Sequence, residues 1–308
     1  MSRVVVLGSA NMDLVVRMPR RPEPGETLTG TRFETGAGGK GLNQAIAAVR
    51  AGAEVAFIGA VGSDSFGERL RARLIDDGVD DSRLQTLGAV TGIAQISVTD
   101  DGENTIVIVP GANAHEGFDA ADRALVEGAS HLVVQLERPA TVIAEAMRFA
   151  RERGVTTVLT PAPAREGIDD LIDLSDILVP NEGEAMLLSG APDAESASIA
   201  LSRRARTVVV TLGSRGALVA EAGEIVRRVA PRPVEAIDTT GAGDTFVGVM
   251  VAWLVAGRPL AEALDAATAG ASIAVTRAGA ASSMPMRDEI IAALAQRVGR
   301  QRAATKAA

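Results

Sequence analysis

The segment 238–246, which reads Asp-Thr-Thr-Gly-Ala-Gly-Asp-Thr-Phe, has the residue types and spacing best suited to chemistry. Its second acid, Asp244, stands at the predicted start of an apolar helix, directly after three small residues, Gly241, Ala242 and Gly243. Free backbone N–H groups and the helix dipole make such a turn an anion site. Asp244 could cap the helix, or it could take a proton from a hydroxyl that attacks a bound phosphate. The glycines favour the second interpretation, because a cap alone needs no glycine clearance.

Polar side chains also follow other predicted strands. Asn11 and Asp13 come after the strand 4–7, and their amide and carboxylate suit sugar hydroxyls, although a plain turn explains them equally well. Glu137 follows the strand 131–136, where the cap of the next helix is the alternative. Ligands of open α/β sheets bind at the carboxyl ends of strands, so these side chains are predicted to share one site.

The segment 36–41 satisfies the pattern G-x-G-x-x-G, which raises the possibility of a dinucleotide site. No clean apolar strand precedes it, and no acid follows at the end of a second strand at the required distance of about 20 residues. It is not a phosphate-binding P-loop either, because Gly41 rather than Ser or Thr follows the lysine. The segment instead predicts a close backbone approach to a ligand at a helix start, through Gly38, Gly39, Lys40 and Asn43.

Three further segments place polar groups after strands or at a helix end. The segment 180–184 opens a helix with Asn181 and Glu184, which suits Mg²⁺ bound through water, and complementation of the helix dipole is the alternative. The loop 211–216 could cradle nucleotide phosphates or simply begin a hairpin. The segment 274–283 offers carbonyls and hydroxyls, or a capped helix end.

Strands and helices alternate along most of the chain, which predicts an α/β fold of three layers around a doubly wound, mostly parallel sheet. The predicted strands are 4–7, 55–58, 131–136, 155–159, 176–179 and 207–211, with a hairpin at 217–229. The predicted helices are 42–51, 66–76, 119–127, 139–153, 182–189, 243–256, 260–277 and 287–298. Two β-rich stretches, about 12–36 and 89–110, interrupt the alternation and are expected to pair as a lid on a single domain spanning 1–308. The stretch 17–33 within the first is expected to form a small polar β-element or flap.

Composition narrows the function further. The 308 residues are 47% hydrophobic and only 2% aromatic, so Val, Ile, Leu and Ala must fill the core. The net charge of −8 argues against nucleic acid as a partner. The absence of cysteine and the presence of only two histidines exclude thiolate chemistry and multi-histidine metal sites. Without a signal peptide or a long apolar run, the chain is expected to be cytoplasmic and to avoid membranes, with a disordered tail at 300–308.

Read together, these motifs resemble the ribokinase-like (PfkB) carbohydrate kinases over nearly the whole chain. The motifs that carry the resemblance are 8–13, 38–44, 111–114, 135–137, 161–165, 180–184, 211–216 and 238–246. The resemblance implies an ATP-dependent sugar kinase in which Asp244 deprotonates the primary hydroxyl of a furanose, with D-ribose the expected acceptor. The N–H groups of Gly241, Ala242 and Gly243 would then stabilise the charge that develops on the transferred phosphoryl group.

The same resemblance implies roles for the other positions. Sugar contacts are expected from Asn11, Asp13, Gly38, Gly39, Lys40, Asn43 and Glu137. Nucleotide contacts are expected from Asn181, Thr211, Gly213, Ser214, Gly216, Gly243 and Thr268. Glu184 would hold Mg²⁺ through water, and a monovalent cation such as K⁺ would lie at Asp238, Thr240, Ala274, Arg277, Gly279 and Ser283. The lid would also join two chains in a homodimer.

Some positions depart from the family pattern and leave the sugar open. Thr160 stands where asparagine commonly precedes Pro-Ala-Pro-Ala, Val247 replaces a frequent asparagine, and the Ala-rich stretch 191–205 is short where a helix is expected. A fructokinase, deoxyribokinase or nucleoside kinase is the nearest alternative, although the low aromatic content argues against stacking a base. The presence of Asp244 argues against a non-catalytic sugar or nucleotide sensor, which would not need a base. The chain has no dinucleotide-binding fingerprint after its first strand, which argues against an NAD-dependent oxidoreductase.

Overall fold

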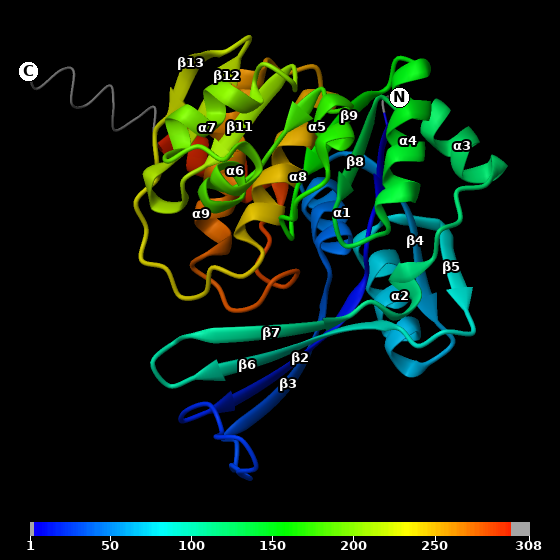
Figure 1. Ribbon diagram of the computed structural model, residues 1–308, viewed down its shortest axis with the longest axis vertical. Helices are drawn as coiled ribbons and strands as arrows, with labels where there is room; N and C mark the ends of the chain where they lie inside the picture. The colour runs from blue at the N-terminus through cyan, green and yellow to red at the C-terminus, as the bar shows by residue number, and fades with distance from the viewer. Residues whose placement is uncertain (1–2, 297–308) are drawn as a thin grey trace, which may run out of the picture.

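The computed structural model describes residues 3–296, whose strands form two separate β-sheets (Figure 1). The large sheet has nine strands, which lie in the order β13 (Glu224–Val229), β12 (Ala217–Glu221), β11 (Thr207–Thr211), β10 (Ile177–Leu178), β9 (Thr156–Thr160), β8 (His131–Gln135), β1 (Arg3–Leu7), β4 (Glu54–Gly62) and β5 (Asp80–Leu87). Neighbouring strands from β11 to β5 are parallel, and β12 and β13 complete one edge as an antiparallel hairpin.

Helices cover both faces of this sheet and make the three expected layers. On one face lie α1 (Lys40–Arg50), α2 (Ser65–Asp77), α8 (Ala242–Val255) and α9 (Leu260–Ala274). On the other lie α3 (Ala120–Glu127), α4 (Ala140–Glu152), α5 (Asp169–Asp173), α6 (Glu182–Ser189) and α7 (Ala194–Leu201). No helix within residues 3–296 is long and apolar enough to cross a membrane.

The strands supply side chains to both cores because successive residues of a strand point to opposite faces. In β1, Val4 and Val6 pack into the core beneath α1 and α8, whereas Val5 and Leu7 pack into the core beneath α4. All four side chains are fully buried or nearly so. This explains why the sequence of β1 is a continuous apolar run, as expected for a strand buried on both faces.

The small sheet consists of β3 (Arg32–Gly38), β2 (Asn11–Met18), β6 (Gly92–Thr99) and β7 (Asn104–Val109), in that order. Figure 1 shows these strands extending away from the body of the molecule. β2 and β3 are antiparallel, β2 and β6 are parallel, and a tight turn joins β6 to β7. The expected second sheet is therefore confirmed.

Several elements differ from those expected. The strands β2 and β3 flank the stretch 17–33 rather than lying within it, and β5 was not foreseen because its sequence is polar with one buried leucine, Leu84. Two short helices have no counterpart among the predicted ones: α5 lies between β9 and β10, and α7 lies within the Ala-rich stretch 191–205. Residues 287–296 are helical, as expected, whereas positions 297–298 of that predicted helix and the tail 300–308 lie outside the described residues.

Candidate active site

Asp244 lies in the first turn of α8 and is almost completely buried. Two side chains of the first turns of α1 donate to its carboxylate: Asn43 Nδ2 to Oδ2 at 3.0 Å and Gln44 Nε2 to Oδ1 at 2.9 Å. Burial raises the pKa of Asp244, although the charge of Lys40 and the hydrogen bonds from Gln44 and Asn43 oppose the shift. The arrangement is a fixed carboxylate of raised basicity, as a general base requires.

The amide of Gln44 is itself held from behind. Its Oε1 accepts a hydrogen bond from Gln135 Nε2 at 2.7 Å, and its Nε2 also donates to Thr160 Oγ1 at 3.3 Å. Gln135 and Thr160 are the last residues of β8 and β9, so two strands of the large sheet fix the orientation of the amide. Threonine at position 160 therefore supplies a hydroxyl acceptor in this network.

Glu137 lies beside the start of α1. Its Oε2 accepts hydrogen bonds from the hydroxyl of Ser9 and from the Lys40 N–H, the latter at 3.0 Å. The alternative interpretation of Glu137 as a helix cap is wrong, because α4 is capped by Pro139 with no side-chain hydrogen bond. Glu137 thus joins the loop after β1 to the first residue of α1.

Asn11 and Asp13 lie on β2 rather than in a turn. The Oδ1 of Asn11 accepts a hydrogen bond from Asn113 Nδ2 at 2.7 Å, and Asn113 also bonds both backbone groups of Ala10. Asn113 belongs to the short 3₁₀ helix η1 (Gly111–Ala114). The small sheet and η1 together therefore fix the Asn11 amide.

The electrostatics of these acids are coupled. Burial raises the pKa of Asp13 to about 7, and the charges of Glu137 and Asp244 contribute to the shift. Burial would lower the pKa of Lys40, but Asp244, Glu137 and Glu184 together raise it. Lys40 is thus a half-buried cation whose charge is close enough to interact with carboxylates from several elements.

Glycines at the start of α1 allow the chain to pass close to itself. A Cβ on Gly38 would collide with the Asp13 carboxylate, and a Cβ on Gly39 would lie 2.7 Å from the Asn11 nitrogen. Gly39 also has a φ of 92°, a left-handed conformation that favours glycine. The close approach expected at this segment is therefore made to the sugar-site candidates of β2.

The N-terminal turn of α8 has a different character. Gly241 caps the helix with a φ of 74°, and a Cβ there would lie 3.1 Å from the Cα of Ala280. A Cβ on Gly243, by contrast, would have no heavy atom within 4 Å among the described residues. The Ala242 N–H, which was expected to face an anion, instead donates to the Thr239 carbonyl at 3.2 Å. The open space beside Gly243 is where a phosphate group would fit.

The predicted nucleotide residues lie at neighbouring strand ends. Asn181 and Glu184 form a reciprocal capping box at the start of α6, with both hydrogen bonds at 2.8 Å. Thr211 pairs with Asn181 in an isolated parallel bridge, and the loop after it forms the 3₁₀ helix η2 (Gly213–Arg215), which includes Ser214, before Gly216 starts the hairpin. Acids in the first turn of α6 agree with the alternative of helix-dipole complementation, the hairpin after Gly216 is confirmed, and the expected ligand roles stay predictions.

Glu184 remains coupled to the catalytic end despite its capping role. Burial raises its pKa, and the charges of Lys40 and Asp244 both act on its carboxylate. No group of three or more His, Asp or Glu side chains within residues 3–296 could hold a metal by itself. A divalent ion at Glu184 would therefore need ligands from a bound nucleotide or water.

The residues expected to bind a monovalent cation lie around the turn before α8. Asp238 accepts hydrogen bonds from the Thr240 N–H at 2.9 Å and from the Gly279 N–H at 2.8 Å. Burial opposes ionisation of Asp238, but these hydrogen bonds hold its pKa below the usual value. Ala274 ends α9, and its carbonyl accepts the Arg277 N–H at 3.0 Å.

Two predicted residues are engaged elsewhere. The carbonyl of Ser283 accepts a hydrogen bond from the Arg277 guanidinium at 3.5 Å, and the hydroxyl of Ser283 donates to the Ala280 carbonyl at 2.8 Å. Thr268, expected at the nucleotide, is buried in α9, where its hydroxyl donates to the Leu264 carbonyl at 2.8 Å.

Sequence reasoning assigned no role to four polar residues that hold the site together, namely Ser9, Gln44, Asn113 and Gln135. All four are buried, and all four lie within motifs that carried the resemblance to the kinase family, at positions 8–13, 38–44, 111–114 and 135–137. The sequence did contain a clue, because polar side chains within such motifs are candidates for hydrogen bonds that hold a site together. Their contacts depend on strands far apart in the sequence, which the pattern could not place.

Comparison with known proteins supports this arrangement. The chain matches the family described as pfkB family carbohydrate kinase over residues 1–287. It is 41% identical to the ribokinase of Haemophilus influenzae over 297 residues, which cover 94% of this chain and 97% of that one. It is 37% identical to the ribokinase of Mus musculus over 304 residues, with 94% of each chain covered.

Solved structures lead to the same family. The structure of Arabidopsis thaliana ribokinase complexed with ribose and ATP aligns with a TM-score of 0.90 at 33% identity, covering 96% of this chain and 99% of that one. The ribokinase of Thermotoga maritima aligns with a TM-score of 0.88 at 31% identity, covering the same two shares. The resemblance expected from the motifs is confirmed. This chain belongs to the pfkB family of carbohydrate kinases.

Proposed function

We propose that the protein transfers the γ-phosphoryl group of ATP to D-ribose and forms D-ribose 5-phosphate. The observation that carries the proposal is the buried Asp244 carboxylate, which Asn43 and Gln44 hold at the open, glycine-lined start of α8. Relatives that share more than a third of their residues with this chain are named ribokinase, and one related structure contains ribose and ATP. These likenesses favour ribose among the furanoses.

Asp244 would act as the general base. Its raised pKa brings it closer to neutral pH, where a carboxylate can accept a proton from the sugar hydroxyl as the new O–P bond forms. The Asn43 and Gln44 amides keep the carboxylate in one orientation. Backbone N–H groups of Gly241 and Gly243, with the helix dipole, would stabilise the negative charge that grows on the transferred group.

The sugar would lie between β2 and the start of α1. Asp13 and Glu137 supply acceptors for sugar hydroxyls, and Asn11 supplies an amide. The charge of Lys40 acts on Asp244 and Glu184 and would offset the carboxylates and the incoming phosphate. Gly38 and Gly39 keep the chain clear of Asp13 and Asn11, so they shape this pocket indirectly.

ATP would bind along Asn181 and the loop 211–216, with Gly243 beside its phosphates. Mg²⁺ fits this end, because one Glu184 oxygen accepts no hydrogen bond from the described residues and can face a hydrated ion. When bound, Mg²⁺ would neutralise phosphate charge. K⁺ fits the oxygen-rich turn around Asp238 and Gly279, where an ionised carboxylate and backbone carbonyls are the ligands that such a cation prefers.

We further propose a homodimer through the small sheet. Every residue of β7 is exposed, including the apolar side chains of Ile106, Val107, Ile108 and Val109, and Phe33 of β3 is also exposed. A sheet with unpartnered apolar residues on both faces of an edge strand is prone to associate. A cytoplasmic location follows from the proposed use of ATP, which is an intracellular metabolite.

The proposal is tested by measuring ATP consumption with Mg²⁺ and K⁺ across ribose, 2-deoxyribose, fructose, tagatose and adenosine. We expect the highest kcat/KM with ribose. A clear preference for another acceptor would retain the kinase chemistry and overturn the assignment of the sugar. ATP binding without turnover of any acceptor would favour a sensor instead.

A further inference from the structure

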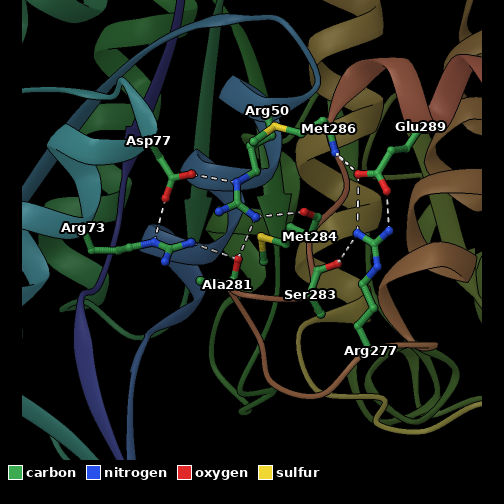
Figure 2. A network of polar contacts seen from close by, with 9 residues as sticks. All are labelled: Arg50, Arg73, Asp77, Arg277, Ala281, Ser283, Met284, Met286 and Glu289. Carbon is green, nitrogen blue, oxygen red and sulfur yellow. Dashed lines mark hydrogen bonds and ion pairs between the residues drawn. The ribbon is translucent and has the colours of Figure 1, made fainter.

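The irregular segment 277–286, which follows α9, has no regular secondary structure, and only part of it is buried: Ala278, Ser282 and Met286 are exposed. Ala280, Ala281, Ser283 and Met284 are all at most 8% exposed. Buried carbonyl groups need hydrogen-bond donors, and a segment without a helix or strand must find them elsewhere. Figure 2 shows that arginine side chains supply many of them.

Arg50 makes the central contacts. One of its terminal nitrogens donates to the Ala281 carbonyl at 3.0 Å and to the Met284 carbonyl at 2.8 Å, while its Nε donates to Asp77 at 2.7 Å (Figure 2). Arg73 pairs with the other oxygen of Asp77 at 2.6 Å and donates to the Ala281 carbonyl at 3.2 Å. We call Arg50, Arg73 and Asp77 the arginine clamp.

The clamp is built from the ends of two helices. Arg50 is the last residue of α1, and Asp77 is the last residue of α2. The side chains of Arg50 and Asp77 are only 12% and 7% exposed. An ion pair buried to this degree is costly unless its geometry is good and its remaining groups are bonded, so this arrangement strictly fixes the segment that it contacts.

The clamped segment supports the turn at the start of α8. The Gly279 N–H donates to Asp238 at 2.8 Å, and Ala280 packs against Gly241, the cap of α8. Asp238 also bonds Thr240, so the whole turn before Gly241 rests on residues 279–280. Movement of this segment would change the position of the proposed anion site.

The start of α1, at the opposite end from Arg50, holds the proposed general base, Asp244. Asn43 and Gln44, near its start, bind the Asp244 carboxylate. α1 and α8 also cross closely, because a Cβ on Gly248 would lie 2.5 Å from the Cβ of Ala47. One helix thus bonds the base at its start and, through Arg50, the support of the anion site at its end.

We propose that the arginine clamp positions the N-terminal turn of α8 relative to Asp244 and so sets the rate of phosphoryl transfer. This inference rests on the proposed function of that turn. Arg50, Arg73 and Asp77 touch neither sugar nor nucleotide in this role, and they act through residues 279–284. Errors of about 1 Å in the placement of reacting groups can cost about 10²-fold in rate, so a modest shift of the turn is sufficient.

Two substitutions test the clamp. Arg50→Lys keeps a charge beside Asp77 but has one nitrogen, which cannot replace the separate N–H groups of the guanidinium. Arg73→Gln removes one of the two donors to the Ala281 carbonyl and is the milder change. We expect kcat to fall about tenfold in each variant, while KM for ribose and for ATP stays within about twofold.

Arg71→Gln is the matched control. Arg71 lies on α2, as Arg73 does, and it also pairs with an aspartate, Asp81, and a carbonyl, that of Leu84, yet it does not contact 277–286. Its loss should affect stability to a similar degree and leave kcat unchanged. Equal kcat losses in Arg71→Gln and Arg73→Gln, or wild-type kcat in both clamp variants, would overturn the proposal.

The proposed active site is tested separately with Asp244→Asn. If this variant keeps wild-type turnover, the site assignment fails whatever the clamp variants do. If Asp244→Asn is inactive and both clamp variants turn over normally, only the positioning role is refuted. Thermal melts of all the variants show whether each protein is folded at the assay temperature.

Discussion

Gly243→Ala should produce a protein that is at least as stable as the original but a much poorer kinase. In the structure, a Cβ at this position meets no heavy atom within 4 Å among the described residues, so the methyl group displaces nothing. Alanine is also favoured over glycine inside a helix by about 0.5–1 kcal/mol. The free energy of unfolding should therefore stay constant or rise by up to about 1 kcal/mol.

Activity should move in the opposite direction. The space beside Gly243 is the proposed place of the phosphate oxygens, and a methyl group there would displace them by about 1 Å, a misplacement that can cost about 10²-fold in kcat/KM for ATP. The assay is steady-state ATP consumption with varied ATP at saturating ribose, together with a denaturant melt. Gly248→Ala, on the same helix, is the contrasting control, since its Cβ would meet Ala47 at 2.5 Å and should destabilise the fold. Wild-type kcat/KM for ATP in a stable Gly243→Ala protein would refute the placement of the phosphate.

Three other outcomes are expected. Asp244→Asn should lower kcat by at least about 10²-fold while ATP binding, followed by calorimetry, persists; near-normal turnover would rule out Asp244 as the base. Because the pKa of Asp13 is raised to about 7, KM for ribose should rise as the pH falls from about 8 to about 6. Protonated Asp13 should also add to the free energy of unfolding below about pH 4, and this contribution should disappear as the pH rises through about 7. Asp13→Asn should lack the pH dependence of both KM and stability, and the same pH profiles in the variant and the original protein would exclude Asp13 as their cause. The paired change Ile106→Lys and Ile108→Lys should give monomers in sedimentation, and an unchanged dimer would place the interface elsewhere.

The chain's local patterns predicted much of the large sheet. Continuous apolar runs such as 4–7 and 207–211 identified strands buried on both faces, and the glycine turn before Asp244 identified the start of α8. β5 was missed because an edge strand buries little, and its polar sequence has no clear period. The periodicity of apolar residues reflects which side chains are buried, so a strand or helix that buries few side chains is hard to predict from the sequence.

The residues of the candidate site were predicted to lie together, but their contacts were not predicted. Asp244, Lys40 and Glu137 were each identified from their place after a strand or at a helix start. The residues that hold these side chains in place were not identified, because Gln135 bonds Gln44 across 91 positions of the sequence and Asn113 bonds Asn11 across 102 positions. Such pairs depend on how strands are ordered in the sheet, and a single sequence does not encode that order in any local pattern.

The shortest strand of the large sheet has a mechanical consequence. β10 contributes only Ile177 and Leu178, yet it joins β11, which leads to the proposed nucleotide loop, with the strands that lead to the proposed sugar site. Ile177 packs into one core and Leu178 into the other. Backbone hydrogen bonds beyond β10, from the Val179 N–H to the Leu159 carbonyl at 2.8 Å and from the Thr211 N–H to the Pro180 carbonyl at 2.9 Å, continue this seam, and the apolar layers above and below it add to its resistance to shear. If the proposed sites are right, the alignment of the two substrates would depend in part on how Ile177 and Leu178 pack in the two cores.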